Sequence, residues 1–85
     1  MGIDELRKEI DSVDARLFEL FEQRMEISRK IALWKKSEGR AVHDPAREEQ
    51  KLREIAEKSA EMAEYSVRLW KLLMELSRDY QSEVV

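Results

Sequence analysis

Residues 3–37, IDELRKEIDSVDARLFELFEQRMEISRKIALWKKS, decide the fold because they carry one continuous heptad pattern. Apolar residues recur at alternating spacings of three and four, and one arginine occupies a place in the series. The heptad positions are Ile3, Leu6, Ile10, Val13, Leu17, Leu20, Arg24, Ile27, Ile31 and Trp34. Such a pattern is typical of a single long helix with an apolar seam. Asp4 suits the N-cap or first turn of this helix, and Gly39 suits its C-terminal end.

A helix of this length does not fit inside a compact monomer. About 34 helical residues at ~1.5 Å each make a rod of ~50 Å. A compact chain of this length has a radius of gyration of roughly 12 Å and a diameter nearer ~30 Å. The remainder of the chain is too short to cover the whole seam. We therefore expect a second copy of the chain to cover it, most simply in a two-fold dimer.

The composition favours an all-α protein and argues against several classes of function. The chain of 85 residues has 2 glycines, 1 proline, 1 histidine and no cysteine, so neither a disulfide framework, a zinc site nor a glycine-rich phosphate loop is expected. Its 16 basic and 19 acidic residues give a net charge of -3, so an anionic ligand must meet a local cluster of cations. The same balance of charge argues against a nucleic-acid partner. Without a long apolar run, we expect a cytoplasmic protein with no membrane partner.

Two shorter helices are expected after the long one. Asp44 is a good N-cap and Pro45 fits the first helical position, so a second helix is predicted to start there. The break before the third helix is placed within residues 59–64, which contain neither glycine nor proline. The predicted all-α domain covers residues 1–85, with helices at 4–37, 45–59 and 64–82. The expected buried faces are Leu52, Ile55, Ala56 and Ser59 in the second helix, and Val67, Trp70, Leu73, Met74, Ser77, Tyr80 and Gln81 in the third.

Arg24 does not fit a purely structural seam, because a buried guanidinium without a partner is costly. It could set the register by pairing with a glutamate, extend out to water, or bind an anion. Lys35 lies three turns plus ~20° further along the helix, so both cations point to one side. Arg7 lies about 25 Å before Arg24 along the axis. Only the partner's Arg7, in an antiparallel dimer, could approach the same ligand.

The second and third helices add further polar candidates. Arg47 lies in the first turn of the second helix with Asp44 and Glu48, where a cation beside the positive helix end favours an anion. A solvated face, or a pair between Arg47 and Asp44, would also account for it. Ser77 and Gln81 lie one turn apart on the apolar face of the third helix, where small polar residues are often simply tolerated. No site role is assigned to Asp11, Asp14 or His43.

Taken together, these residues make the chain resemble the all-helical, AroQ-type chorismate mutase family. LRKEIDSVDARLFELFEQRMEISRKIALWKK resembles the family's long first helix. VHDPAREEQKL resembles its V-x-D-x-x-R-E motif, and RLWKLLMELSRDYQ resembles its third helix with an S-x-x-x-Q ending. The resemblance covers essentially the whole chain. One departure is the connection between the second and third helices, which looks a few residues short.

The resemblance implies an isomerase that converts chorismate to prephenate by a Claisen rearrangement, in phenylalanine and tyrosine biosynthesis. It also implies an intertwined homodimer of three-helix chains with two equivalent sites. The partner's Arg7 would complete each site. The residues supplied by one chain would be Arg24, Lys35, Asp44, Arg47, Glu48, Ser77 and Gln81. The reaction is pericyclic, so no cofactor, metal or nucleophile is expected.

The residue types suit this chemistry. Chorismate is a dianion, and arginine side chains bind carboxylates through two parallel hydrogen bonds. The breaking C–O bond builds negative charge on the ether oxygen, to which Lys35 and Gln81 would donate. Glu48 would hold the ring hydroxyl. The catalytic candidates are therefore Arg24, Lys35, Glu48 and Gln81.

Other functions remain open from the sequence. An isochorismate-pyruvate lyase on the same scaffold would also need a dianion site and a lysine. A non-catalytic helical dimerisation module would carry Arg24 only as a destabilising buried charge. A mutase that needs a partner protein for full activity is equally compatible with these residues.

Overall fold

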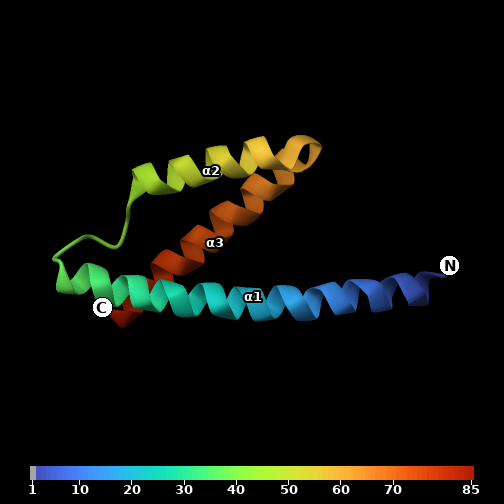
Figure 1. Ribbon diagram of the computed structural model, residues 1–85, viewed down its shortest axis with the longest axis horizontal. Helices are drawn as coiled ribbons and strands as arrows, with labels where there is room; N and C mark the ends of the chain where they lie inside the picture. The colour runs from blue at the N-terminus through green and yellow to red at the C-terminus, as the bar shows by residue number, and fades with distance from the viewer. Residues whose placement is uncertain (1) are drawn as a thin grey trace.

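The computed structural model describes residues 2–85, which form three α-helices joined by short connections (Figure 1). The elements are α1 (Ile3–Ser37), α2 (Pro45–Ser59), the 3-10 helix η1 (Ala60–Met62) and α3 (Ala63–Val84). No strand occurs within this range. The predicted all-α fold, with one long helix and two shorter ones, is therefore confirmed.

The ends of α1 follow from local hydrogen bonds. Gly2 is the N-cap, and its amide lies 3.4 Å from the carboxylate of Glu5. Asp4 therefore lies in the first turn, where its negative charge stabilises the positive helix end. Past the helix, Gly39 has a φ of 66°, and its amide donates to the carbonyl of Lys36 at 3.2 Å. This left-handed glycine ends the helix and turns the chain toward α2.

The connection from α2 to α3 is unusually tight. α2 begins with Asp44 as N-cap, since its carboxylate accepts from the amide of Arg47 at 3.1 Å. At the other end, Ala60 has a φ of 51°, and η1 leads directly into α3. Positive φ values are costly for a residue with a side chain. The expected break within residues 59–64 is thus a strained turn, which lacks the glycine that would mark it in the sequence.

The helices form a rod with a hairpin folded onto it. In Figure 1, α1 runs the full length of the molecule, and α2 and α3 form a hairpin on one side of it. α3 packs against both other helices, and the C-terminus lies beside the C-terminal half of α1. The molecule measures 55 × 25 × 15 Å with a radius of gyration of 15.9 Å. A compact chain of this length would have roughly 12 Å, so the chain is extended.

The apolar seam of α1 is not the face that packs within the chain. Its apolar members are 41–61% exposed. The buried positions of α1 are Ser28 and Ala32, which follow the seam residues Ile27 and Ile31 by one place. Every residue from 2 to 20 is exposed. The seam therefore stays open in a single chain, as its length leads one to expect.

The core is small and centred where the three helices meet. Its buried apolar residues are Ala32 of α1, Ile55 of α2 and Met74 of α3. Ile55 and Met74 belong to the faces that the helical spacing predicts. Ser28, Ser77 and Gln81 are buried beside them. No helix within residues 2–85 is long and apolar enough to cross a membrane.

Candidate functional site

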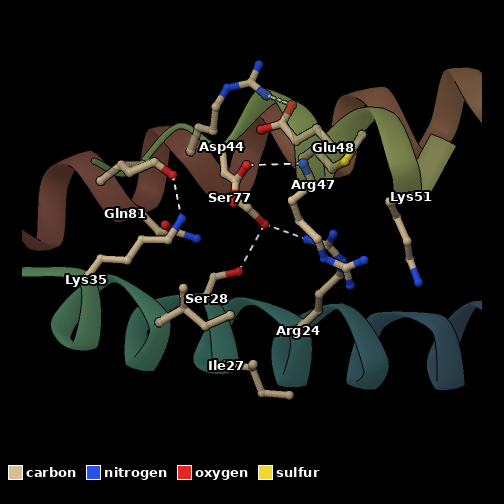
Figure 2. A pocket seen from close by; sticks show the side chains of 14 residues that line it. Arg24, Ile27, Ser28, Lys35, Asp44, Arg47, Glu48, Lys51, Ser77 and Gln81 are labelled. Atoms are coloured by element: carbon tan, nitrogen blue, oxygen red, sulfur yellow. Dashed lines mark hydrogen bonds and ion pairs between the residues drawn. The ribbon is translucent and has the colours of Figure 1, made fainter. Parts of the chain in front are cut away.

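A cavity of about 440 Å³ opens between the three helices (Figure 2). Its size lies within the range of ~300–1,000 Å³ that is typical of ligand sites. The walls come from the C-terminal half of α1, the first turns of α2, the loop before α2 and the C-terminal half of α3. The charged residues in its lining are the basic Arg24, Lys35, Arg47, Lys51 and Arg78 and the acidic Asp44 and Glu48. This excess of positive charge favours an anionic ligand.

The structure brings together all but one of the predicted site residues. The residues that line the cavity are Arg24, Lys35, Asp44, Arg47, Glu48, Ser77 and Gln81. Arg7 lies elsewhere, on the N-terminal part of α1. Its side chain is 71% exposed, and its Nη1 lies 3.9 Å from Oδ1 of Asp4. Within one chain, Arg7 and Arg24 do not share a site.

Arg24 is held by neutral groups of α3. Its Nη1 donates to the hydroxyl of Ser77 at 2.5 Å (Figure 2) and to the carbonyl of Leu73 at 3.4 Å. Ser77 Oγ lies 3.0 Å from Oγ of Ser28, so the two buried serines join α1 to α3. Burial lowers the pKa of the Arg24 guanidinium. No carboxylate in residues 2–85 forms an ion pair with it, so pairing with a glutamate is not the reason for its position.

Lys35 and Gln81 supply hydrogen-bonding groups at the cavity. Nζ of Lys35 donates to the carbonyl of Val42 at 2.7 Å, which ties the loop before α2 to α1. The side chain of Gln81 is buried, and its Oε1 has no hydrogen-bond partner within residues 2–85. Figure 2 shows both side chains extending toward the cavity that they line. A primary ammonium has three donors and a carboxamide two, so both retain capacity for a ligand.

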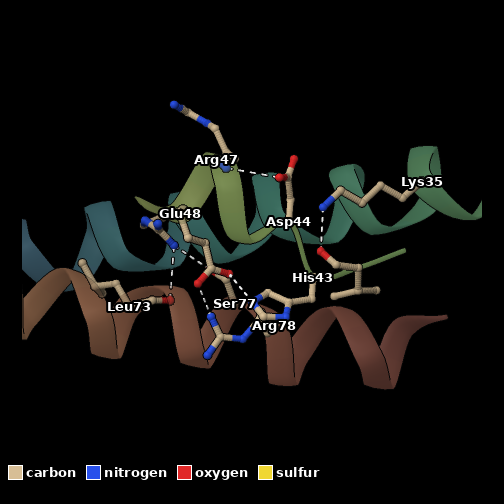
Figure 3. A network of polar contacts seen from close by, with 10 residues as sticks. Lys35, His43, Asp44, Arg47, Glu48, Leu73, Ser77 and Arg78 are labelled. Atoms are coloured by element: carbon tan, nitrogen blue, oxygen red, sulfur yellow. Dashed lines mark hydrogen bonds and ion pairs between the residues drawn. The ribbon is translucent and has the colours of Figure 1, made fainter. Parts of the chain in front are cut away.

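The first turn of α2 contributes Asp44, Arg47 and Glu48. Asp44 accepts from the backbone amide of Arg47, so the two form a cap and no side-chain ion pair. Oε1 of Glu48 accepts from Nη1 of Arg78 on α3. Its Oε2 lies 3.8 Å from Nε2 of His43 (Figure 3). Glu48 therefore lies between a guanidinium from α3 and an imidazole from the loop.

Three polar residues of the lining were not identified from the sequence. Lys51 follows Arg47 by four residues and lies on the same face of α2. This spacing is visible in the sequence and could have identified Lys51 as a lining residue. Ser28 and Arg78 gain their importance only from tertiary packing, since each bonds to a residue of another helix. His43, to which no role was assigned, is exposed but faces Glu48.

The donor set is suited to an organic anion. Guanidinium and ammonium groups converge from all three helices, and the carboxylate of Glu48 offers an acceptor for a hydroxyl group. Within residues 2–85, no group of three acidic or histidine side chains is placed to hold a metal ion.

Comparison with known proteins gives one match. A family model described as chorismate mutase type II matches residues 6–82. No curated protein and no solved structure gives a significant match.

Proposed function

Because the match spans residues 6–82, the chain belongs to the chorismate mutase type II family, and we propose on this basis that it rearranges chorismate to prephenate. The observation that carries the proposal is the cavity, which gathers the cationic residues of three separate sequence motifs around one space. This reaction belongs to the synthesis of phenylalanine and tyrosine.

The two carboxylates of chorismate are assigned to arginines. The Nη1 of Arg24 donates to Ser77 and to Leu73. A guanidinium has five N–H donors in a fixed plane, so Nε and Nη2 of Arg24 can bind a carboxylate through two parallel hydrogen bonds. Arg47 sits in the first turn of α2, where the positive helix end adds to its charge. Ser77 contributes a neutral donor.

Lys35 and Gln81 are assigned to the ether oxygen. During the rearrangement the C–O bond of the enolpyruvyl ether breaks while a C–C bond forms within the same molecule, so negative charge grows on that oxygen. Donors that are already in place stabilise such charge without reorganising. Each donor of this kind contributes about 3–4 kcal/mol, by comparison with removals of oxyanion-hole donors. The tie of Lys35 to Val42 supports this role, because it limits the ammonium to one region of the cavity.

Glu48 is assigned to the ring hydroxyl of the substrate. Its carboxylate lies in the first turn of α2 and lines the cavity together with the cations of the three helices. Contacts at opposite ends of the molecule hold the flexible enolpyruvyl arm over the ring. Fixing reacting atoms in such a geometry lowers the barrier of an intramolecular reaction.

We propose further that the enzyme is an intertwined homodimer in which the partner's Arg7 completes each site. Two features support this arrangement. The exposed seam of α1 is apolar at every position except Arg24, and its N-terminal part forms a groove lined by Ile3, Leu6, Glu9, Ile10 and Val13. An antiparallel second copy of α1 would cover this seam and carry its own Arg7 toward Arg24.

The proposed function is tested by adding purified protein to chorismate, following the loss of chorismate absorbance and identifying the product. Rapid formation of prephenate without added metal or cofactor is the expected result. Isochorismate is offered in parallel. Release of pyruvate from isochorismate, with chorismate left unchanged, would identify a lyase instead. A folded protein that converts neither compound would contradict both reactions.

A further inference from the structure

We propose that Arg78 is a positioning residue that fixes the carboxylate of Glu48 for the substrate, an inference that rests on the proposed function. Arg78 belongs to α3 and Glu48 to α2, and their side chains meet across the cavity through Nη1 and Oε1 (Figure 3). Both residues line the cavity. Their side chains are 32% and 22% exposed, so the pair is shielded from much of the solvent.

The pair leaves one oxygen of Glu48 for a ligand. Oε1 is engaged by Arg78, whereas Oε2 has only His43 nearby, at 3.8 Å. A free glutamate side chain samples many rotamers and loses that freedom when it binds. The hydrogen bond from the Arg78 guanidinium to Oε1 restricts the rotamers of Glu48 before the substrate binds. Oε2 is then presented as a single acceptor for the hydroxyl group of the substrate.

The charge of Arg78 also resolves a conflict within the proposed site. A carboxylate beside a dianionic substrate repels it, and this repulsion is strong in a partly desolvated cavity. The only other acidic side chain in the lining, Asp44, is occupied as the cap of α2. A guanidinium bound to Glu48 compensates its negative charge while leaving its acceptor function intact. Arg78 acts in this way through Glu48 and needs no contact with the reacting atoms.

The test is a double-mutant cycle on kcat/KM for chorismate. The proteins are the wild type, Arg78→Met, Glu48→Gln and the double variant, with Arg78→Lys as a conservative replacement. Arg68→Met is the matched control, because Arg68 is an exposed arginine of the same helix outside the cavity lining. Urea unfolding of each protein checks that it is folded under the assay conditions.

We expect Arg78→Met to lower kcat/KM by about 10- to 100-fold, the range for loss of one hydrogen bond between charged groups. Arg78→Lys should restore most of this loss, and Arg68→Met should have no effect. In the Glu48→Gln background, the change at Arg78 should cost no more than about twofold, because residues that act as a unit are not additive. A purely structural arginine would keep its effect in that background.

Two results would overturn the inference. One is an unchanged kcat/KM for Arg78→Met, and the other is an equal loss in both backgrounds, which would mean that Arg78 acts independently of Glu48. A second measurement does not depend on turnover. Nitrogen-15 NMR of the Arg78 side chain should show slow guanidinium rotation that becomes fast in Glu48→Gln, and fast rotation in the wild type would refute the ion pair.

A wild type that leaves chorismate unchanged would contradict the proposed function. An active enzyme in which Arg78 and Glu48 are not coupled would contradict this inference alone.

Discussion

The guanidinium of Arg24 donates to the hydroxyl of Ser77 across the contact between α1 and α3, with Nη1 and Oγ 2.5 Å apart. The bond orients a positive charge without neutralising it, since the acceptor is neutral. The leucine carbonyl that shares Nη1 is neutral as well. The packing of the two helices thus places the cation before any ligand arrives, and its counter-charge is left for the ligand to supply.

Replacement of Arg24 by methionine should separate activity from stability. We expect kcat/KM for chorismate to fall by at least about 100-fold, because a charged hydrogen-bonding group is lost from the site. The free energy of unfolding should stay the same or rise by about 1 kcal/mol, because a half-buried charge without a counter-ion is removed. Urea unfolding and steady-state kinetics measure the two effects. Gain of stability without any loss of activity would remove Arg24 from the proposed site.

Replacement of Lys35 by alanine should act on the chemical step. Loss of one preorganised donor lowers kcat by about 100- to 1,000-fold in comparable sites, and the dimer should remain intact. Lys36→Ala is the control, since Lys36 is the next residue, is exposed and does not line the cavity. Near-normal turnover of Lys35→Ala would remove Lys35 from the proposed site.

Replacement of Gln81 by glutamate should give the enzyme an acidic pH preference. An ionised carboxylate cannot donate to the ether oxygen, whereas a protonated carboxyl group can. The ordinary pKa of a glutamate is about 4.3, and burial raises it. The rate should therefore increase as the pH falls through the pKa of the introduced group. Measurements of kcat from neutral to acidic pH test this prediction. Gln50→Glu is the control, because Gln50 is exposed. A pH profile of Gln81→Glu that runs parallel to that of the wild type would contradict the role of Gln81.

Replacement of Ala60 by glycine should stabilise the fold. Ala60 has a φ of 51°, a conformation that costs about 1–2 kcal/mol for a residue with a side chain and little for glycine. We expect the free energy of unfolding to increase by about 1 kcal/mol in urea titrations. Ala63→Gly, at the start of α3, should instead destabilise by about 0.5–1 kcal/mol, because glycine disfavours a helix. Equal effects at both positions would show that the turn is not strained.

The sharing of Arg7 between chains can be tested by complementation. Sedimentation should give about twice the chain mass of 10.1 kDa. Arg7→Ala and Arg24→Ala should each be inactive as homodimers. After unfolding and refolding together, about half of the dimers are mixed, and one of their two sites has both arginines. Recovery of about one quarter of wild-type activity is expected, and no recovery would contradict a site shared between chains.

The sequence predicted the long helix and most of the polar side chains of the cavity lining well, because both depend on local spacing. The heptad locates α1, and Asp44 with Pro45 marks the start of α2. The same periodicity did not show which face of α1 meets α3, since that choice favours the small residues Ser28 and Ala32 over the larger seam residues. The face of α1 that packs against α3 is chosen by how closely the two helices can approach. The spacing of apolar residues does not contain this information.

Arg78 illustrates the second limit of the sequence. Its neighbour Ser77 was recognised from a motif, but Arg78 itself looked like one more surface charge on a highly charged chain. Its partner Glu48 lies 30 residues away, on another helix. Only the angle at which α2 and α3 meet brings the two together. The chain turns between these helices at Ala60, whose φ is 51°, within the predicted break at residues 59–64 but without a glycine to mark the position.

The N-terminal half of α1 has a consequence for how this protein behaves on dilution. Helical segments without tertiary contacts are marginal in water, and every residue from 2 to 20 is exposed in one chain. In the proposed dimer, folding of that half and association of two chains become a single equilibrium, so the unfolding midpoint rises with protein concentration. Activity per chain should likewise decline once the enzyme is diluted below the dissociation constant of its dimer. The specific activity of the enzyme would then depend on its concentration.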